Sequence, residues 1–228
     1  MDHLAARPDL ADLADLTLDE LRLALAPEVA AAAIFDGWSE TALLHAAEMA
    51  GADADIARLA FPGGAMDMIE AWIDTIDAAM ARDLPREQLA AMKIRERIRA
   101  LVQYRLDAVA GLEEALRRAL AVMAQPQNAP RALRIGWRSA DMMWRLAGDT
   151  ATDYNHYTKR AILASIYAAT LAVYVDDESE DKAATRAFLD RRIEGVMRFE
   201  KLKAHFTAPE RDGFSMMRFL GRLRYPSR

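Results

Sequence analysis

Apolar side chains recur every three or four residues along most of the chain, and Gly and Pro fall in clusters between these segments. This spacing places apolar residues on one face of a helix, whereas a strand would alternate apolar and polar residues. The pattern predicts an all-α protein. The expected helices span residues 17–34, 40–49, 55–61, 66–81, 87–108, 112–124, 129–146, 157–175 and 180–205.

The sharpest change from polar to apolar falls in residues 148–177. Gly148–Arg160 is rich in Asp, Thr and Asn, and the fifteen residues Ala161–Val175 then contain no charge. A helix this apolar is a buried helix, since spanning a bilayer takes about 20 apolar residues. We therefore expect a central helix that is preceded by a surface turn.

Residues 34–64 have the outline of a helix-turn-helix, with Phe35 as its anchor and turns at Gly37 and Gly51. This outline matches the amino-terminal domain of tetracycline-repressor-like regulators. Reading DNA requires basic and amide side chains on the second helix of the pair. Here residues 39–61 carry four acids and one Arg, a net charge of −3. We expect a helical scaffold that binds no nucleic acid.

With 228 residues, of which 53% are hydrophobic and 29% charged, the chain can form one sizeable core or two small ones. The break at Leu84-Pro85 predicts a boundary between domains 1–83 and 84–206, followed by a terminal segment 207–228. The sequence contains no Cys, and its amino terminus is acidic and unlike a signal or transit peptide. These features predict a cytoplasmic protein.

The end of the chain is basic, and the rest is acidic. Residues 198–228 hold eight Lys and Arg against three acids, and the preceding residues hold 22 against 32. Wound as a helix, the tail places apolar side chains on one face and Arg on the other. Such a helix binds an anionic membrane surface, or else it docks on the protein itself or on a second subunit. The residues concerned are Met216, Phe219, Leu220 and Leu223 on the apolar face, and Arg218 and Arg222 opposite.

Several other features leave two interpretations open. The basic segment Lys93–Arg99 follows helical spacing and indicates a solvated helix face rather than a nucleic-acid patch. Met and Trp are frequent in the second half, either as solid core or as the lining of an adaptable cavity. Asp153 and His156 could contribute to a metal site, or Asp153 could cap a helix beside an exposed His156.

No catalytic motif is present. The four His stand far apart, and neither HExxH, a Gly-rich phosphate loop nor GxSxG occurs. We therefore expect a protein that is not an enzyme and that carries no cofactor and no resident metal.

Seven motifs together resemble the ubiquinone (coenzyme Q) biosynthesis accessory proteins that are ninth in that naming series. The block at residues 148–160 is the most specific of them. The motifs are FDGWSE (35–40), RLAFPGGA (58–65), KIRERI (93–98), AQPQNAP (124–130), WRSADMMW (137–144), GDTATDYNHYTKR (148–160) and FLDRRIEGVM (188–197).

The resemblance implies a tetracycline-repressor-like fold with a degenerate helix-turn-helix domain and a larger helical domain that binds an isoprenoid lipid. It also implies a homodimer on the bacterial inner membrane that presents a quinone intermediate to a pathway hydroxylase. The docking patch for that enzyme would contain Tyr154, His156, Tyr157 and Arg160. At position 156 the family usually has Trp.

The apolar lining of the lipid site would come from three helices of the second half. We expect it to include Leu120, Met123, Trp137, Met143, Ile162 and Ile166. Two other function classes stay open, namely a transcriptional regulator that senses an apolar ligand and an enzyme acting on a quinone precursor.

Overall fold

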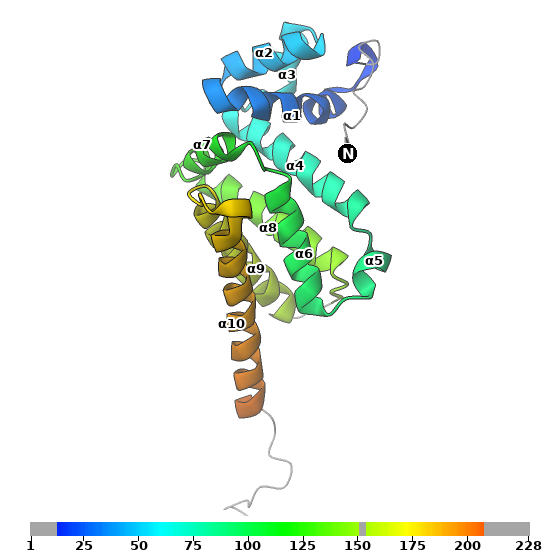
Figure 1. Ribbon diagram of the computed structural model, residues 1–228. Helices are drawn as coiled ribbons and strands as arrows, with labels where there is room; N and C mark the ends of the chain where they lie inside the picture. The colour runs from blue at the N-terminus through cyan, green and yellow to red at the C-terminus, as the bar shows by residue number, and fades with distance from the viewer. Residues whose placement is uncertain (1–12, 151–153, 208–228) are drawn as a thin grey trace, which may run out of the picture. The chain divides into compact units, whose positions relative to one another are not determined.

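The computed structural model describes residues 13–150 and 154–207, and all regular secondary structure in these ranges is helical (Figure 1). Residues up to Asp190 belong to one compact unit, and a second unit begins at Arg191. The all-α prediction is confirmed for the described residues. The helices are η1 (Leu13–Asp15), α1 (Leu18–Asp36), α2 (Glu40–Ala50), α3 (Ala54–Ala60), α4 (Ala65–Asp83), α5 (Arg86–Ala90), α6 (Ile94–Asp107), α7 (Glu113–Met123), α8 (Ala129–Leu146), α9 (Tyr154–Tyr174), η2 (Glu180–Lys182) and α10 (Ala183–Thr207).

Helix boundaries follow the polar signals in the sequence closely. Thr17 and Glu20 form the expected capping box of α1, Ser39 caps α2, and Asp53 accepts hydrogen bonds from two backbone N–H groups of α3. Gly51 ends α2 with a positive φ of 74°, a conformation that glycine adopts without strain. These side chains satisfy backbone groups that the helices leave unpaired.

One predicted helix is wrong. Residues 87–108 form two helices, α5 and α6, because Arg97 supports a break between them. Its Nε donates to the Met92 carbonyl at 2.9 Å and its Nη2 to the Ala90 carbonyl at 3.0 Å. The helix expected from residue 180 likewise begins with a separate turn, where Asp181 and Lys182 have positive φ angles.

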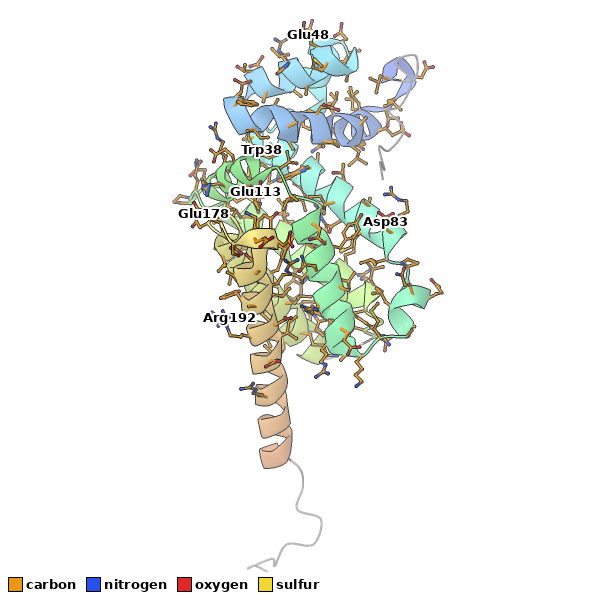
Figure 2. All side chains as sticks on the ribbon, viewed as in Figure 1. Trp38, Glu48, Asp83, Glu113, Glu178 and Arg192 are labelled. Atoms are coloured by element: carbon orange, nitrogen blue, oxygen red, sulfur yellow. The ribbon has the colours of Figure 1, made fainter. Side chains whose placement is uncertain are left out.

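At one end of the first unit, α1 packs against α2, α3 and α4 (Figure 1). Phe35 does not anchor this group as expected, because its side chain is 80% exposed. The anchor is Trp38, which is buried, lies 5.3 Å from the Trp72 ring, and donates from Nε1 to the Ala115 carbonyl of α7 at 2.9 Å. Figure 2 shows Trp38 where the helix-turn-helix meets α7.

Helices α4 and α6–α9 form the larger part of this unit, with α8 packed along α9. Helix α9 is only partly the buried central helix that its composition predicts. Leu163, Ile166 and Leu171 are buried, but the opposite face, formed by small residues including Ala161 and Ala168, is exposed. In the described part of the chain, no helix is long and apolar enough to cross a bilayer.

Candidate functional site

The first turns of α9 are held in place by a buried arginine. The Arg160 side chain is 2% exposed, and its Nε donates to Asp141 Oδ1 of α8 at 2.5 Å. Its Nη1 donates to Asp149 Oδ2 at 3.1 Å and to the His156 carbonyl at 3.0 Å. Charge-assisted hydrogen bonds of this kind fix geometry firmly. Arg160 therefore joins α8, the residues that follow it and α9.

A lysine and a tryptophan reinforce the same junction. Lys159 Nζ donates to Asp149 Oδ1 at 2.7 Å and lies 5.4 Å from the centre of the Trp144 ring. Trp144 Nε1 in turn donates to the Lys159 carbonyl at 3.0 Å. Three polar residues of the segment expected to form an exposed turn, Asp149, Lys159 and Arg160, thus bond to one another or to α8 and α9.

The carboxyl end of α8 is capped by arginines from the α5–α6 segment. Arg86 donates to the Arg145 carbonyl at 2.9 and 2.7 Å, and Arg97 Nη1 donates to the Ala147 carbonyl at 2.7 Å. Helix ends leave such carbonyls unpaired, and cations there also interact favourably with the helix dipole. Arg97 of the basic segment 93–99 thus holds α6 against the end of α8. The sequence pattern alone did not indicate this contact.

An aromatic surface lies beside this junction. Tyr157 of α9 is 62% exposed, and its ring centroid is 6.0 Å from that of the half-buried Trp137 of α8. The His156 ring meets Tyr157 edge-on at 5.1 Å. Leu133, one turn before Trp137 on α8, is also exposed. We call Leu133, Trp137, His156 and Tyr157 the aromatic surface.

Two of the four expected docking residues lie in the aromatic surface, namely His156 and Tyr157. Arg160 does not, because its buried guanidinium is enclosed by Asp141 and Asp149 and offers no surface to a partner. In this structure Arg160 is a positioning residue, and the direct contact with a partner that was expected of it stays a prediction. The Tyr154 side chain lies outside the described residues.

The six expected lining residues fall on α7, α8 and α9, which pack on one another through α8. Met143 and Ile166 are buried, whereas the other four are half-buried: Leu120, Met123, Trp137 and Ile162. Trp137 belongs to both sets, since it is a lining candidate that contacts the expected docking residue Tyr157. The structure thus brings the two predicted sites together on α8 and α9.

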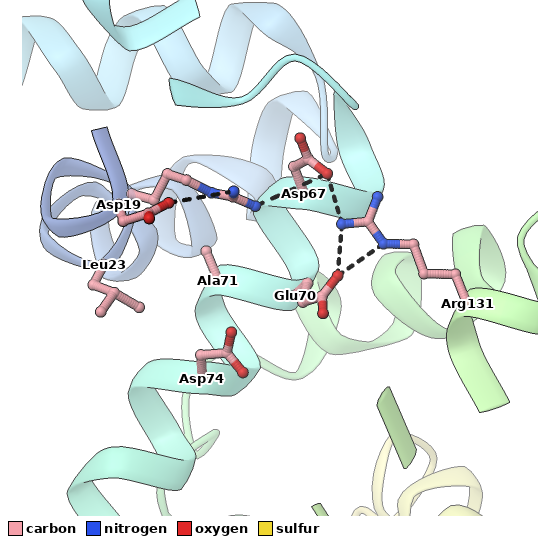
Figure 3. A pocket seen from close by; sticks show the side chains of 8 residues that line it. Asp19, Leu23, Asp67, Glu70, Ala71, Asp74 and Arg131 are labelled. Atoms are coloured by element: carbon pink, nitrogen blue, oxygen red, sulfur yellow. Dashed lines mark hydrogen bonds and ion pairs between the residues drawn. The ribbon is translucent and has the colours of Figure 1, made fainter. Parts of the chain in front are cut away.

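A pocket of about 380 Å³ lies elsewhere, between α1, α4 and α8 (Figure 3). Its walls are charged, and Arg131 bridges Asp67 and Glu70 with 2.6 Å ion pairs. Burial raises the pKa of the Asp74 carboxyl in the same wall, although Arg138 counteracts the shift. None of the six expected lining residues takes part in this pocket, and its charges do not suit an apolar ligand.

Residues 129–200, which contain α8 and α9, match the family model described as COQ9. The chain is 33% identical to the mitochondrial ubiquinone biosynthesis protein COQ9 of Rattus norvegicus, over 71% of this chain and 54% of that protein. It is 31% identical to the Homo sapiens protein of the same name, over 71% of this chain and 52% of the human protein. The chain is a relative of the COQ9 proteins. The resemblance drawn from its motifs is confirmed, and the chain spans about half the length of these relatives.

The fold that the COQ9 resemblance implied is confirmed by a solved structure. The TetR transcriptional regulator from Nitrosomonas europaea superposes with a TM-score of 0.63 at 23% identity, over 78% of this chain and 99% of the regulator. At this identity the likeness establishes the fold alone.

In this COQ9 relative, the one cation of residues 39–61 pairs with two acids. Arg58 Nε lies 2.6 Å from Glu40 Oε1, and its Nη1 lies 2.7 Å from Asp55 Oδ1. Ile56 and Leu59 of α3 are exposed, and Glu48 projects from α2 (Figure 2). The described surface of this helix pair is acidic and apolar, and the expectation that it binds no nucleic acid stays a prediction.

Two further predicted sites, a metal site and a membrane-binding helix, lie partly or wholly outside the described residues. Among residues 13–150 and 154–207, no group of three or more metal-ligating side chains could hold a metal ion. Asp153 of the possible Asp153–His156 metal site, and all six residues expected to bind a membrane, lie outside these ranges.

Proposed function

We propose that this chain is a non-catalytic lipid-binding accessory protein of ubiquinone biosynthesis that presents an isoprenoid quinone intermediate to a hydroxylase of the pathway. The observation that carries the proposal is the contact between Trp137 and Tyr157, within the segment that matches the COQ9 family. A residue of the expected lipid lining thereby adjoins a residue of the expected docking patch.

The lipid-binding part of the proposal is supported by the character of α7, α8 and α9. Leu120 and Met123 on α7 and Ile162 on α9 are half-buried apolar side chains, and both helices contact α8. Met is flexible and polarisable, so a site containing Met123 and Met143 adapts to an elongated apolar ligand. We expect these helices to part slightly around an isoprenoid tail.

The docking part is supported by the aromatic surface. Tyr and Trp dominate the binding energy of protein interfaces, because they bury a large area at a small cost in conformational entropy. Tyr157 is exposed while Arg160 fixes the backbone beneath it through the His156 carbonyl. A pre-organised exposed tyrosine of this kind suits a protein partner, and the partner we propose is the hydroxylase.

A homodimer at the cytoplasmic face of a bacterial inner membrane completes the proposal. The exposed face of α9 carries small side chains such as Ala161, Ser165 and Ala168, which allow a second helix to approach closely. The basic tail, residues 207–228, would bind anionic lipid headgroups and bring the chain to the bilayer that holds its ligand. The relatives named above are mitochondrial proteins.

Mass spectrometry of the protein purified without detergent tests the lipid-binding part. We expect an isoprenoid lipid to co-purify with the wild-type chain, and bound lipid to decrease when Ile162 and Ile166 are both changed to Asn. Absence of any co-purifying lipid, together with no binding of added isoprenoid quinones, would refute the proposal.

A further inference from the structure

A buried polar cluster lies in the core of the larger helical part, where four helices contribute one side chain each. Arg105 of α6 and Asp77 of α4 form an ion pair, and Ser139 of α8 donates to Asp77 Oδ2 at 3.0 Å. Arg105 Cζ lies 4.8 Å from the ring centroid of Tyr167 of α9. Arg105, Asp77 and Ser139 are each at most 3% exposed. Periodicity and motifs do not indicate this cluster, because its four residues lie far apart in the chain.

One hydrogen-bond donor of this cluster has no acceptor among the described residues. This donor is Arg105 Nε, which is buried. The two oxygens of Asp77 already accept from Arg105 Nη1 and from Ser139 Oγ. A buried N–H without an acceptor costs stability, and native proteins rarely retain one without a reason.

The charges around Arg105 indicate which kind of acceptor it would take. The guanidinium and the Asp77 carboxylate cancel, so the cluster as a whole is neutral. A phosphate or carboxylate would add a second negative charge beside Asp77 with no cation left to balance it. The acceptor that fits Nε is therefore a neutral oxygen, such as a carbonyl or an ether.

Two of the helices that carry the cluster, α8 and α9, also carry four of the six expected lining residues. Met143 lies one turn after Ser139 on α8, and Ile166 directly precedes Tyr167 on α9; both are buried. On α6, Leu101, Val102 and Leu106 beside Arg105 are buried as well. Buried apolar residues thus flank the cluster along α6, α8 and α9, and ligand sites commonly combine such apolar residues with a few polar groups that orient the ligand.

We infer that Arg105 is the polar anchor of the lipid site, and that its Nε donates a hydrogen bond to a carbonyl or ether oxygen in the head group of a neutral lipid. This inference rests on the proposed lipid-binding function and adds to it the residue that would hold the head group. It explains why a buried arginine is kept among apolar helices, where the ion pair alone gives no net gain over apolar side chains.

Equilibrium binding of two matched ligands tests the inference. One is a short-chain isoprenoid quinone, and the other is a methylbenzene that carries the same tail and has no oxygen. Arg105→Lys keeps the cation opposite Asp77 but removes the N–H at the ε position. Arg99→Lys on the same helix is the control, because Arg99 is exposed and pairs with Asp190.

We expect the wild type and Arg99→Lys to bind the quinone at least about tenfold more tightly than the methylbenzene, and Arg105→Lys to lose this preference. Equal affinity of the wild type for both ligands, or an unchanged preference in Arg105→Lys, overturns the inference and leaves lipid binding intact. Binding of neither ligand by the wild type overturns the proposed function as well.

A wild-type measurement covers the case in which Arg105→Lys does not fold. In a crystal structure of the quinone complex, we expect an oxygen of the quinone within about 3.2 Å of Arg105 Nε. A water molecule at Nε, with the quinone oxygens elsewhere, overturns the inference.

Discussion

Tyr157 of α9 packs against Trp137 of α8 with ring centroids 6.0 Å apart and planes inclined by 30°. One ring is mostly exposed and the other is half-buried, so the pair connects the surface of the protein to the interior of the helical bundle. A tilted geometry at this separation is favourable for aromatic rings. A partner that covers Tyr157 would therefore change the surroundings of Trp137, which is a candidate lining residue of the lipid site.

Tyr157→Ala is expected to weaken binding to the hydroxylase by about 2 kcal/mol or more, because an exposed aromatic at the centre of an interface contributes strongly. Its effect on the free energy of unfolding should stay within about 0.5 kcal/mol, as for other exposed positions. Isothermal titration calorimetry and urea unfolding measure the two quantities. Phe35→Ala is the control, because Phe35 is the more exposed aromatic and lies on α1. Equal losses of affinity in both variants would contradict the assignment.

Arg160→Met is expected to lower the free energy of unfolding by about 3–5 kcal/mol, since it leaves the carboxylates of Asp141 and Asp149 without their buried cation. Arg145→Met is the matched control. Arg145 also pairs with Asp141, but its side chain is 69% exposed, so its loss should cost less than about 1 kcal/mol. Urea unfolding compares the two. Similar small losses would show that Arg160 does not hold α8 and α9 together.

Much of the fold follows from the sequence because its signals are local. Capping residues such as Thr17, Ser39 and Asp53 lie within a few residues of the groups that they satisfy, and each performs the expected role. The break between α5 and α6 was missed because Arg97 stabilises it partly through Ala147, fifty residues away. The residues on either side of this break continue a helical pattern of apolar positions.

The candidate site was predictable only in part. Motif resemblance assigned His156, Tyr157 and Arg160 to a docking patch, which stays a prediction. In the structure Tyr157 is exposed and His156 is half-buried, whereas Arg160 is buried. A sequence does not reveal that Asp141 and Asp149 enclose this guanidinium. The cluster of Arg105, Asp77 and Ser139 depends entirely on contacts between distant helices. Periodicity reveals which face of a helix is apolar, and it does not reveal which polar residue inside that face finds a partner.

Acidification provides a test of the turn between α9 and α10. Burial raises the pKa of Asp177, but hydrogen bonds from Ser179 and Thr185 outweigh burial and hold the pKa well below its usual range. A depressed pKa in the folded state contributes stability above the unfolded pKa, about 3.9, which is lost as the pH falls below that value.

We therefore expect Asp177→Asn to be about 1.5–3 kcal/mol less stable than the wild type at pH 7 and to lose less stability between pH 7 and pH 3. Urea midpoints at the two pH values measure this. The neighbouring Asp176 is exposed and pairs with Arg117, so Asp176→Asn should change the stability by less than about 1 kcal/mol. An identical acid-induced loss in Asp177→Asn and the wild type would contradict the assignment.

Removal of residues 213–228 is expected to abolish sedimentation with anionic liposomes, because this segment carries the basic and apolar residues of the proposed membrane helix. Helical content and dimerisation should remain nearly unchanged. Sedimentation at several salt concentrations, with neutral liposomes as a control, measures the electrostatic part. Equal liposome binding by the shortened chain would refute the membrane role of the tail.

We propose that the chain transfers a quinone intermediate to the hydroxylase across the aromatic surface. The most direct test is the rate of product formation by the hydroxylase when the intermediate is supplied bound to the wild-type chain or to Tyr157→Ala loaded with the same amount. We predict fast turnover with the wild type and at least about tenfold slower turnover with the variant, in proportion to the lost docking energy. Equal rates from both loaded chains and from free intermediate would contradict the account.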